Sequence, residues 1–433
     1  MSSHAPYFHF RKFGIVVYFF NASAAPASAK TNMGESMRIP ILVSASALFT
    51  LGALLEAGAA DKQYGPGVTD TEIKIGQTVP YSGPASGFSS YGRVMTGYFQ
   101  MLNEAGGING RKINLISVDN AFSPPKAIEQ TRKLVDDDGV LAEVGTVGTV
   151  PNIAVQKYLN QNKVPQVFIS AGGRRFNDPQ AFPWTVPFYP PFEMEGTFGK
   201  FIIKKFPNAK IAVLYQNDDY GKDYLTGLKA GLGSDGTAKI VAEASYELSY
   251  PTVDSEVLKL KASGADTLVY FTTPKFAAQA IKKANELNWK PVQFLASPVN
   301  SIQGVLTPAG LDNAQGAYTT QFAKQAGDPA WAEDGEVKDY VAFMKKWAPN
   351  DSPNDFIALS GYINAQAIAK GLQRCGDNLT RENLLAQATS FNKERVGMLL
   401  PGIELSNSKE NYAPYRSLRM AIFDKASWKL LDE

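Results

Sequence analysis

The sequence predicts an α/β chain built as two doubly wound lobes, and three observations support this fold class. Strand-like and helix-like segments alternate regularly over residues 73–170. A proline-rich loop, 185–191, interrupts this alternation, which then restarts over residues 192–296. A mixed tail follows from residue 317. Because strands separated by single helices form βαβ units, each run predicts a parallel sheet covered by helices.

The first run contains four expected strands. Ile73, Ile75 and Val79 fall on one side of the first of them, an alternation typical of a half-buried strand. Gly106-Gly107 ends the helix that follows, and Pro125 suits the first turn of the next helix. The expected strands are 73–79, 113–118, 140–144 and 165–170, and the expected helices are 92–104, 125–136 and 151–160.

The second run repeats this order, and the tail adds helices and a hairpin. In the second run we expect helices at 192–206, 222–232, 254–262 and 274–288, and strands at 209–215, 240–244, 266–271 and 292–296. In the tail we expect a strand at 317–320, helices at 337–347, 356–372 and 381–389, and a hairpin of 418–423 with 428–431.

The composition is that of an ordinary globular protein. The 433 residues are 44% hydrophobic and 19% charged, which argues against disorder, and the length suggests two or three domains. A net charge of +2 gives no indication of a nucleic-acid partner or an acidic membrane surface. The single cysteine, Cys375, excludes a disulfide within the chain.

The N-terminal region predicts export. Arg38 follows Met37 as a short positive region, the apolar stretch 39–55 comes next, and Ala57-Gly58-Ala59 resembles a cleavage site. We therefore expect a cleaved signal peptide at 37–60, an extra segment at 1–36 and a periplasmic mature chain. The alternative is a membrane anchor, since the apolar stretch approaches spanning length.

The mature chain lacks the residues that most catalytic and metal sites need. His4 and His9 are the only histidines and are lost with the leader, which excludes Ser-His-Asp and Cys-His arrangements and His/Cys zinc sites. No dinucleotide or P-loop motif is present. Asp218-Asp219 lies between a strand and a helix, where carboxylates favour the helix N-terminus. We expect a protein that is not an enzyme and uses no cofactor or metal.

Three strand-to-helix turns carry the candidate ligand-binding chemistry. The turn at 145–151 offers glycines, hydroxyls and free N–H groups that suit a carboxylate. The turn at 170–175 adds two arginines, and the turn at 217–221 adds an aromatic side chain. Each alone is more often ordinary turn chemistry. Together they fall at the same end of both expected sheets, where doubly wound folds bind their ligands.

These residues also carry a family resemblance. The stretches IKIGQTVPYSGPAS (73–86), MLNEAGGINGRKINLISVDN (101–120), VPQVFISAGG (164–173) and IAVLYQNDDYGKD (211–223) resemble the branched-chain amino acid-binding receptors of ABC transporters, which are type I periplasmic binding proteins. The segment FNDPQAFPWTVPF (176–188) is similar to a branch associated with aromatic carboxylates as well as amino acids. The resemblance covers essentially all of residues 70–433.

The resemblance implies two lobes joined by three crossing strands, near Pro187, Gly316 and Pro401. The N-terminal lobe would comprise 61–187 plus 317–400, and the C-terminal lobe 188–316 plus 401–433. A monomer would close upon a small ligand by hinge motion and deliver it to permease subunits in the inner membrane. A receptor that reports its ligand to a signalling partner, without transport, is the alternative function.

Site residues are carried over by position in the resemblance. Thr149 matches a hydroxyl that meets the ligand carboxylate, and Tyr220 matches the aromatic residue of the second lobe. Arg174 stands where a small residue or threonine is usual, and its guanidinium could bind a carboxylate with two hydrogen bonds. The full set of candidate ligand-binding residues is Phe88, Tyr91, Thr146, Thr149, Gly172, Gly173, Arg174, Tyr220, Phe271, Thr272, Ser297 and Asn300.

One departure from the family pattern bears on the ligand. Amino acid receptors of this family place a carboxylate near the position of Pro298, where it meets the ligand ammonium, and no acidic residue occurs here between Glu286 and Asp312. Asp218 or Asp219 could reach an ammonium from elsewhere. We therefore expect an aromatic or similarly apolar carboxylate as ligand, with branched-chain amino acids second.

Overall fold

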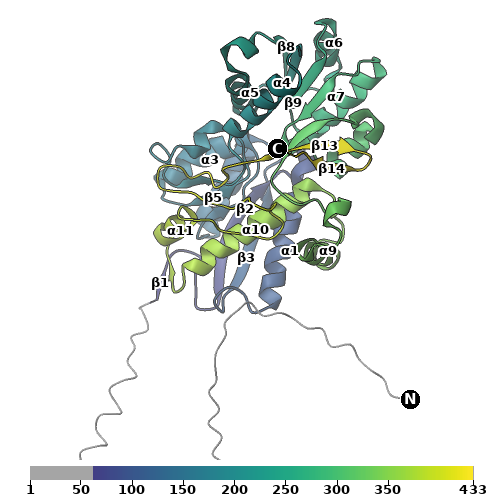
Figure 1. Ribbon diagram of the computed structural model, residues 1–433. Helices are drawn as coiled ribbons and strands as arrows, with labels where there is room; N and C mark the ends of the chain where they lie inside the picture. The colour runs from purple at the N-terminus through teal and green to yellow at the C-terminus, as the bar shows by residue number, and fades with distance from the viewer. Residues whose placement is uncertain (1–61, 433) are drawn as a thin grey trace, which may run out of the picture. The chain divides into compact units, whose positions relative to one another are not determined.

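Two large sheets organise residues 62–432, the part of the chain that the computed structural model describes (Figure 1). The first sheet has five parallel strands. Of these five, the strand that comes first in the chain lies between the strands that come second and third. This is the flavodoxin-like doubly wound order. From one edge to the other its strands are β3 (Lys112–Asp119), β2 (Glu72–Val79), β4 (Glu143–Val144), β5 (Gln166–Ile169) and β6 (Thr185–Pro187).

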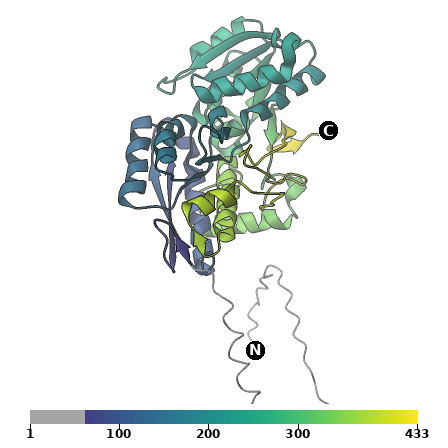
Figure 2. The same cartoon turned by 90° about the vertical axis from the view of Figure 1, so that its left-hand side faces the viewer.

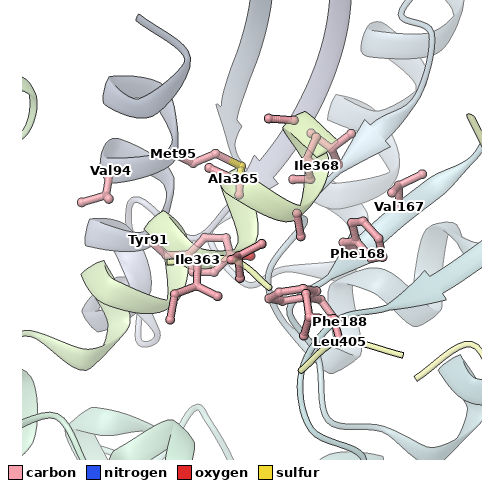
Figure 3. Packing of buried hydrophobic residues seen from close by; sticks show 14 of the residues in the cluster. Tyr91, Val94, Met95, Val167, Phe168, Phe188, Ile363, Ala365, Ile368 and Leu405 are labelled. Atoms are coloured by element: carbon pink, nitrogen blue, oxygen red, sulfur yellow. The ribbon is translucent and has the colours of Figure 1, made fainter. Parts of the chain in front are cut away.

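Helices α1 and α10 pack closely on the first sheet. At their crossing, a Cβ added to Gly361 would lie 2.4 Å from the carbonyl oxygen of Tyr91, so only glycine fits there. Figure 3 shows side chains of both helices and of β5 meeting in the buried core. The helices of this part are α1 (Ser89–Glu104), α2 (Pro124–Arg132), α3 (Thr149–Gln161), α9 (Gly335–Trp347), α10 (Phe356–Arg374) and α11 (Arg381–Ala388).

The second sheet repeats the order of the first and adds a C-terminal hairpin. The hairpin pairs antiparallel with β11, and its yellow strands lie beside the green strand in Figure 2. The strands in spatial order are β14 (Ser427–Leu430), β13 (Arg419–Asp424), β11 (Tyr318–Gln321), β10 (Val292–Leu295), β9 (Thr267–Phe271), β7 (Ile211–Gln216) and β8 (Ile240–Tyr246). The helices of this part are α4 (Gly196–Lys205), α5 (Asp219–Thr237), α6 (Asp254–Ala262), α7 (Pro274–Glu286) and α8 (Thr307–Ala309).

The expected alternation and the two doubly wound sheets are confirmed, with three local differences. Strand β6 forms inside the proline-rich loop 185–191 that was expected to be a linker. Residues 297–314 form several short helical turns that the sequence did not indicate. A small two-stranded sheet pairs β1 (Gln63–Tyr64) with β12 (Asn378–Leu379). These elements are all too short to show a periodic pattern.

Two of the three expected crossings lie further along the chain than the sequence indicated. Strand β6 ends at Pro187 in the first sheet, and the next long strand, β7, belongs to the second sheet. The second crossing falls after Gln321 rather than near Gly316, because β11 pairs with β10 and β13. The third falls just before β13 rather than near Pro401, because residues 403–415 still pack in the core of the first sheet. A strand belongs to the sheet whose strands it is hydrogen-bonded to, and the local sequence pattern does not show which sheet that is.

Among the buried carboxyl groups, Glu143 and Glu195 have side-chain oxygens without a hydrogen-bond partner within the described residues. Glu143 lies in β4 with neither side-chain oxygen hydrogen-bonded, and burial raises its pKa to about 7. Glu195 ends the short 3-10 turn Phe192–Glu195 before α4, its Oε2 has no partner, and burial raises its pKa to about 8. Both side chains are therefore predominantly protonated under mildly acidic conditions.

The expected leader, residues 1–36 and 37–60, lies outside the described residues. Within residues 62–432, none of the helices combines the length and the apolar character that crossing a membrane requires.

Candidate ligand-binding site

A cavity lies at the carboxyl ends of strands from both sheets. Residues that follow β2, β4 and β5 face residues that follow β7, β9 and β10 across it. The strand order reverses between β2 and β4 and between β7 and β9, and doubly wound sheets bind ligands at such switch points. The cavity has a volume of about 60 Å³, several times what a single water molecule requires. It is therefore sized for a small ligand.

The start of α3 forms the cavity wall on the side of the first sheet. Gly148 caps the helix with a φ of 105°, a value that glycine adopts without strain, and Thr149 begins the first turn. Asn152 Nδ2 donates to the Gly148 carbonyl at 2.7 Å, and Thr146 Oγ1 donates to Asn152 Oδ1 at 2.5 Å. The first N–H groups of a helix have no partner within the helix. This turn is thus held in place with donors available beside the cavity.

Tyr91 and Phe88 extend the same wall from the beginning of α1. Asn364 of α10 fixes Tyr91 by donating to its hydroxyl, and the same amide nitrogen donates to the Phe168 carbonyl at 2.7 Å. Burial raises the pKa of Tyr91 well above its usual range, so its ring stays neutral. Figure 3 shows Tyr91 beside the core residues of α10. The buried core thereby sets the position of an aromatic wall.

On the opposite side of the cavity, the wall is supported by packed aromatic rings from the elements around the second sheet. The Tyr220 ring lies 4.6 Å from that of Tyr224, which lies 5.6 Å from that of Phe271. The Tyr220 hydroxyl donates to the Thr272 carbonyl at 3.2 Å. Gly172, which follows β5 of the first sheet, packs against these rings, since a Cβ at Gly172 would lie 2.6 Å from ring and hydroxyl atoms of Tyr224. The two walls are in contact at this point.

Three hydroxyl groups are buried on the cavity wall: Thr272 Oγ1, Ser297 Oγ and the hydroxyl of Tyr189. Thr272 Oγ1 has no hydrogen-bond partner within the described residues, whereas the hydroxyls of Ser297 and Tyr189 lie beside each other. A buried polar group without a partner costs about 1–3 kcal/mol, so such groups are rare unless something binds to them. The position of Thr272 Oγ1 on the cavity wall indicates that it is available to polar atoms of a ligand.

The cavity wall carries no formal charge. None of the described residues that line it is Asp, Glu, Lys, Arg or His. Of the buried carboxyl groups nearby, Asp355 accepts hydrogen bonds from Ser90 Oγ at 2.6 Å and Ser301 Oγ at 2.7 Å. Glu195 lies close to Tyr189 and Tyr220, and its Oε2 has no hydrogen-bond partner within the described residues. Asp218 accepts from the side chain of Gln216. Burial raises the pKa of both Asp355 and Asp218.

Helix N-termini surround this uncharged space. Lining residues come from the first turn, or the residue just before it, of α1, α3, α5, α7 and α10. Each helix N-terminus carries a partial positive charge, equivalent to roughly half an elementary charge. Asp218 and Asp355 cap α5 and α10 with their carboxyl groups, so α1, α3 and α7 are the helices at the cavity whose starts carry no side-chain cap.

Comparison with known proteins identifies the family. A family model described as "Periplasmic binding protein" matches residues 72–420. The chain belongs to this family. A Leu/Ile/Val-binding protein homolog from Brucella abortus is 24% identical over 333 residues, which cover 74% of this chain and 80% of the relative.

Solved structures of other periplasmic binding proteins share the type I fold. A branched-chain amino acid ABC transporter protein from Thermus thermophilus with bound valine has a TM-score of 0.76 at 14% identity, covering 84% of this chain and 97% of that one. A solute-binding protein from R. palustris in complex with benzoate has a TM-score of 0.69 at 21% identity, covering 83% and 95%. At these identities the likeness shows the fold alone.

In this periplasmic binding protein, most of the candidate site residues gather at the cavity. The structure brings together Phe88, Tyr91, Thr149, Gly172, Tyr220, Thr272 and Ser297. Pro298, which stands near the position of the family's carboxylate, also lines the cavity.

Five candidates do not line the cavity. Arg174 is exposed and lines a separate surface pocket with Asp219 and Asp223. Its backbone N–H donates to Asp223 Oδ2 at 2.7 Å, and its guanidinium lies 5.9 Å from the Phe192 ring centre. Its side chain is therefore not placed to bind a ligand carboxylate in the cavity. Thr146, Gly173, Phe271 and Asn300 are buried behind the wall and support the residues that line it.

Sequence reasoning missed several aromatic wall residues. Phe122 follows β3, Tyr189 follows β6, and Phe356 begins α10. The position of Phe122 between an expected strand and an expected helix was a usable signal, equivalent to that of Thr149. Tyr189 and Phe356 had no such signal, because β6 was taken for a loop and α10 returns to the cavity from the C-terminal part of the chain.

Proposed function

We propose that this chain is an exported receptor of an ABC importer, and that it captures a small apolar carboxylate, preferably aromatic, in the cavity between its two sheets. The observation that carries this proposal is a cavity without charged side chains at which five helix N-termini converge. Family membership supports the receptor role, and the cavity chemistry supports the ligand class.

The carboxylate would bind at the start of α3. The hydroxyl of Thr149 and the free N–H groups of the first helical turn are hydrogen-bond donors, and the helix N-terminus favours a negative charge. Ser170, Ala171 and Gly172 complete the wall beside this turn. Such a site binds an anion with backbone and hydroxyl groups and needs no arginine.

An ammonium group has no comparable site. A charge buried without a partner costs several kcal/mol, and an amino acid ligand would bring an ammonium into a cavity that lacks carboxylates. Thr272 and Ser297 offer hydroxyl oxygens, and Pro298 offers no acceptor on its side chain. This contrast favours an acid without an amino group.

Flat apolar surfaces on both walls suit a ring. Phe88, Tyr91, Phe122, Tyr189 and Tyr220 line the cavity, and aromatic pairs contribute beyond the area they bury. The benzoate complex of the R. palustris protein shows that a protein of this fold holds an aromatic acid.

Branched-chain amino acids are the second candidate ligands. The Brucella abortus relative is named a Leu/Ile/Val-binding protein homolog, and the Thermus thermophilus structure contains valine. Their ammonium would have to be met by hydroxyl and carbonyl oxygens of the second wall.

Calorimetry against a panel of acids tests the ligand class. We expect benzoates or phenylpropenoates to bind at least tenfold more tightly than leucine, isoleucine or valine, because about 1.4 kcal/mol of unpaired ammonium cost already gives that factor. Cyclohexanecarboxylate, a non-aromatic acid of similar size, is the control for ring character. Tight leucine binding with no response to any aromatic acid would reject the proposed ligand class and leave the second candidate.

A further inference from the structure

The loop that follows β3 holds two non-glycine residues in the left-handed backbone region. Ala121 has a φ of 48° and Phe122 a φ of 56°. Residues other than glycine, asparagine and aspartate adopt this conformation rarely, and two in succession require support from their surroundings. Phe122 is buried and lines the cavity. Strain at a residue that faces a binding cavity points to a function for that residue.

Two polar side chains hold this loop in its strained form. Asp119 Oδ1 accepts hydrogen bonds from the Ala121 N–H at 2.9 Å and the Ser82 N–H at 3.1 Å. Asn120 is fully buried, and its Oδ1 accepts from the Phe122 N–H at 2.8 Å. Asn120 Nδ2 reaches the Val147 carbonyl at 3.4 Å. The loop is thus tied both to the loop after β2 and to the turn that begins α3.

The Phe122 ring lies against the N-cap of α3. A Cβ added to Gly148 would lie 2.5 Å from Phe122 Cε2, so the ring packs directly on the glycine backbone. Thr149 follows this glycine and lines the cavity next to the ring. The ring therefore lies beside the helix start at which the ligand carboxylate is proposed to bind, and shields one side of it.

We propose that Phe122 is a specificity-determining residue, which Asn120 positions so that its ring closes off the first turn of α3 and limits ligand size. This inference rests on the proposed binding of a small carboxylate in the cavity. The ring serves two purposes: it excludes water from the donors of α3, and it fills space that a larger acid would need. Asn120 touches no ligand and acts through Phe122.

Substitution of Phe122 tests the size limit. Calorimetry with benzoate, 4-tert-butylbenzoate and leucine should show that Phe122→Ala weakens benzoate about tenfold and lowers the preference for benzoate over 4-tert-butylbenzoate by a similar factor, since one bulky group in an apolar pocket changes selectivity by at least that much. Phe122→Leu, which keeps bulk, should change this preference much less.

Phe343→Ala is the matched control, because Phe343 is a similarly buried ring that packs against Tyr98 and Tyr362 on another part of the first core. It should lower the melting temperature and leave the ligand preference unchanged. An unchanged preference in a folded Phe122→Ala protein would overturn the inference.

A double-mutant cycle tests the role of Asn120. Asn120→Ala should shift the benzoate preference in the same direction as Phe122→Ala, and adding it to Phe122→Ala should produce no further shift, because residues that act through one another are not additive. Additive shifts would show that Asn120 does not act through Phe122. If the wild-type protein prefers leucine, the proposed ligand class fails, and Phe122 is then judged by the preference for leucine over the larger phenylalanine.

Discussion

Gly172→Val is expected to weaken ligand binding at least a hundredfold, about 2.7 kcal/mol, while leaving thermal stability nearly unchanged. A Cβ at this position would meet Tyr224 atoms at 2.6 Å, far inside normal contact. Tyr224 is 1% exposed and packed between Tyr220 and Phe271, so it cannot move aside. We expect the clash to be relieved by hinge separation of the two parts of the molecule, with the core of each part intact.

A graded series measures this effect. Gly172→Ala should give a smaller loss than Gly172→Val, and small-angle scattering of Gly172→Val should show no decrease in the radius of gyration on adding a ligand that compacts the wild-type protein. Gly335→Val is the control, since nothing lies within 4 Å of a Cβ at that glycine. Wild-type affinity in folded Gly172→Val would show that contact between the walls is not needed for binding.

The fold was predictable from the sequence because its signal is local. Apolar alternation and helix-ending glycines, such as Gly106-Gly107, act within a few residues and mark each strand and helix. The crossings after Gln321 and before β13 were not predictable in this way. They depend on which strands pair, and the pairing of Tyr318 with Phe294 and Ile422 joins residues far apart in the sequence.

The site was predictable where it follows an expected strand. Thr149, Gly172 and Tyr220 each follow a strand whose carboxyl end faces the cavity, so topology alone places them there. Arg174 lies only two residues beyond Gly172, yet it lines a different pocket on the surface and not the cavity. Topology fixes the position of a loop, but side-chain direction depends on backbone angles that the sequence pattern does not specify.

The sequence alone showed that no carboxylate stands near Pro298, and this was the basis for expecting an acid without an amino group. Pro298 does line the cavity, so that sequence observation concerned a true wall position. The convergence of helix starts, including that of α10 from the C-terminal part of the chain, required the three-dimensional arrangement. The ligand proposal therefore depends on both kinds of observation: a missing negative group and a concentration of helix dipoles.

The two buried glutamates are expected to make the protein less stable as the pH rises. In the unfolded chain Glu195 ionises near its ordinary pKa of 4.5, whereas in the folded chain burial raises the pKa to about 8. The folded state then binds more protons than the unfolded state between these values, so the free energy of unfolding falls across this range, by at most about 5 kcal/mol at 1.36 kcal/mol per pKa unit. The neutral form is stabilising at low pH, and that contribution is lost above pH 8.

Urea unfolding of Glu195→Gln at pH 5 and pH 9 tests this expectation. Glutamine keeps the shape of the protonated acid but cannot ionise, so the variant should match the wild type within about 1 kcal/mol at pH 5 and exceed it by about 3–5 kcal/mol at pH 9. Glu143→Gln should show a smaller gain, about 3 kcal/mol, because the pKa of Glu143 rises only to about 7. Glu129→Gln, at an exposed position, is the control and should show no pH-dependent gain. Equal effects of Glu195→Gln at both pH values would mean that Glu195 is not held in its neutral form by the fold.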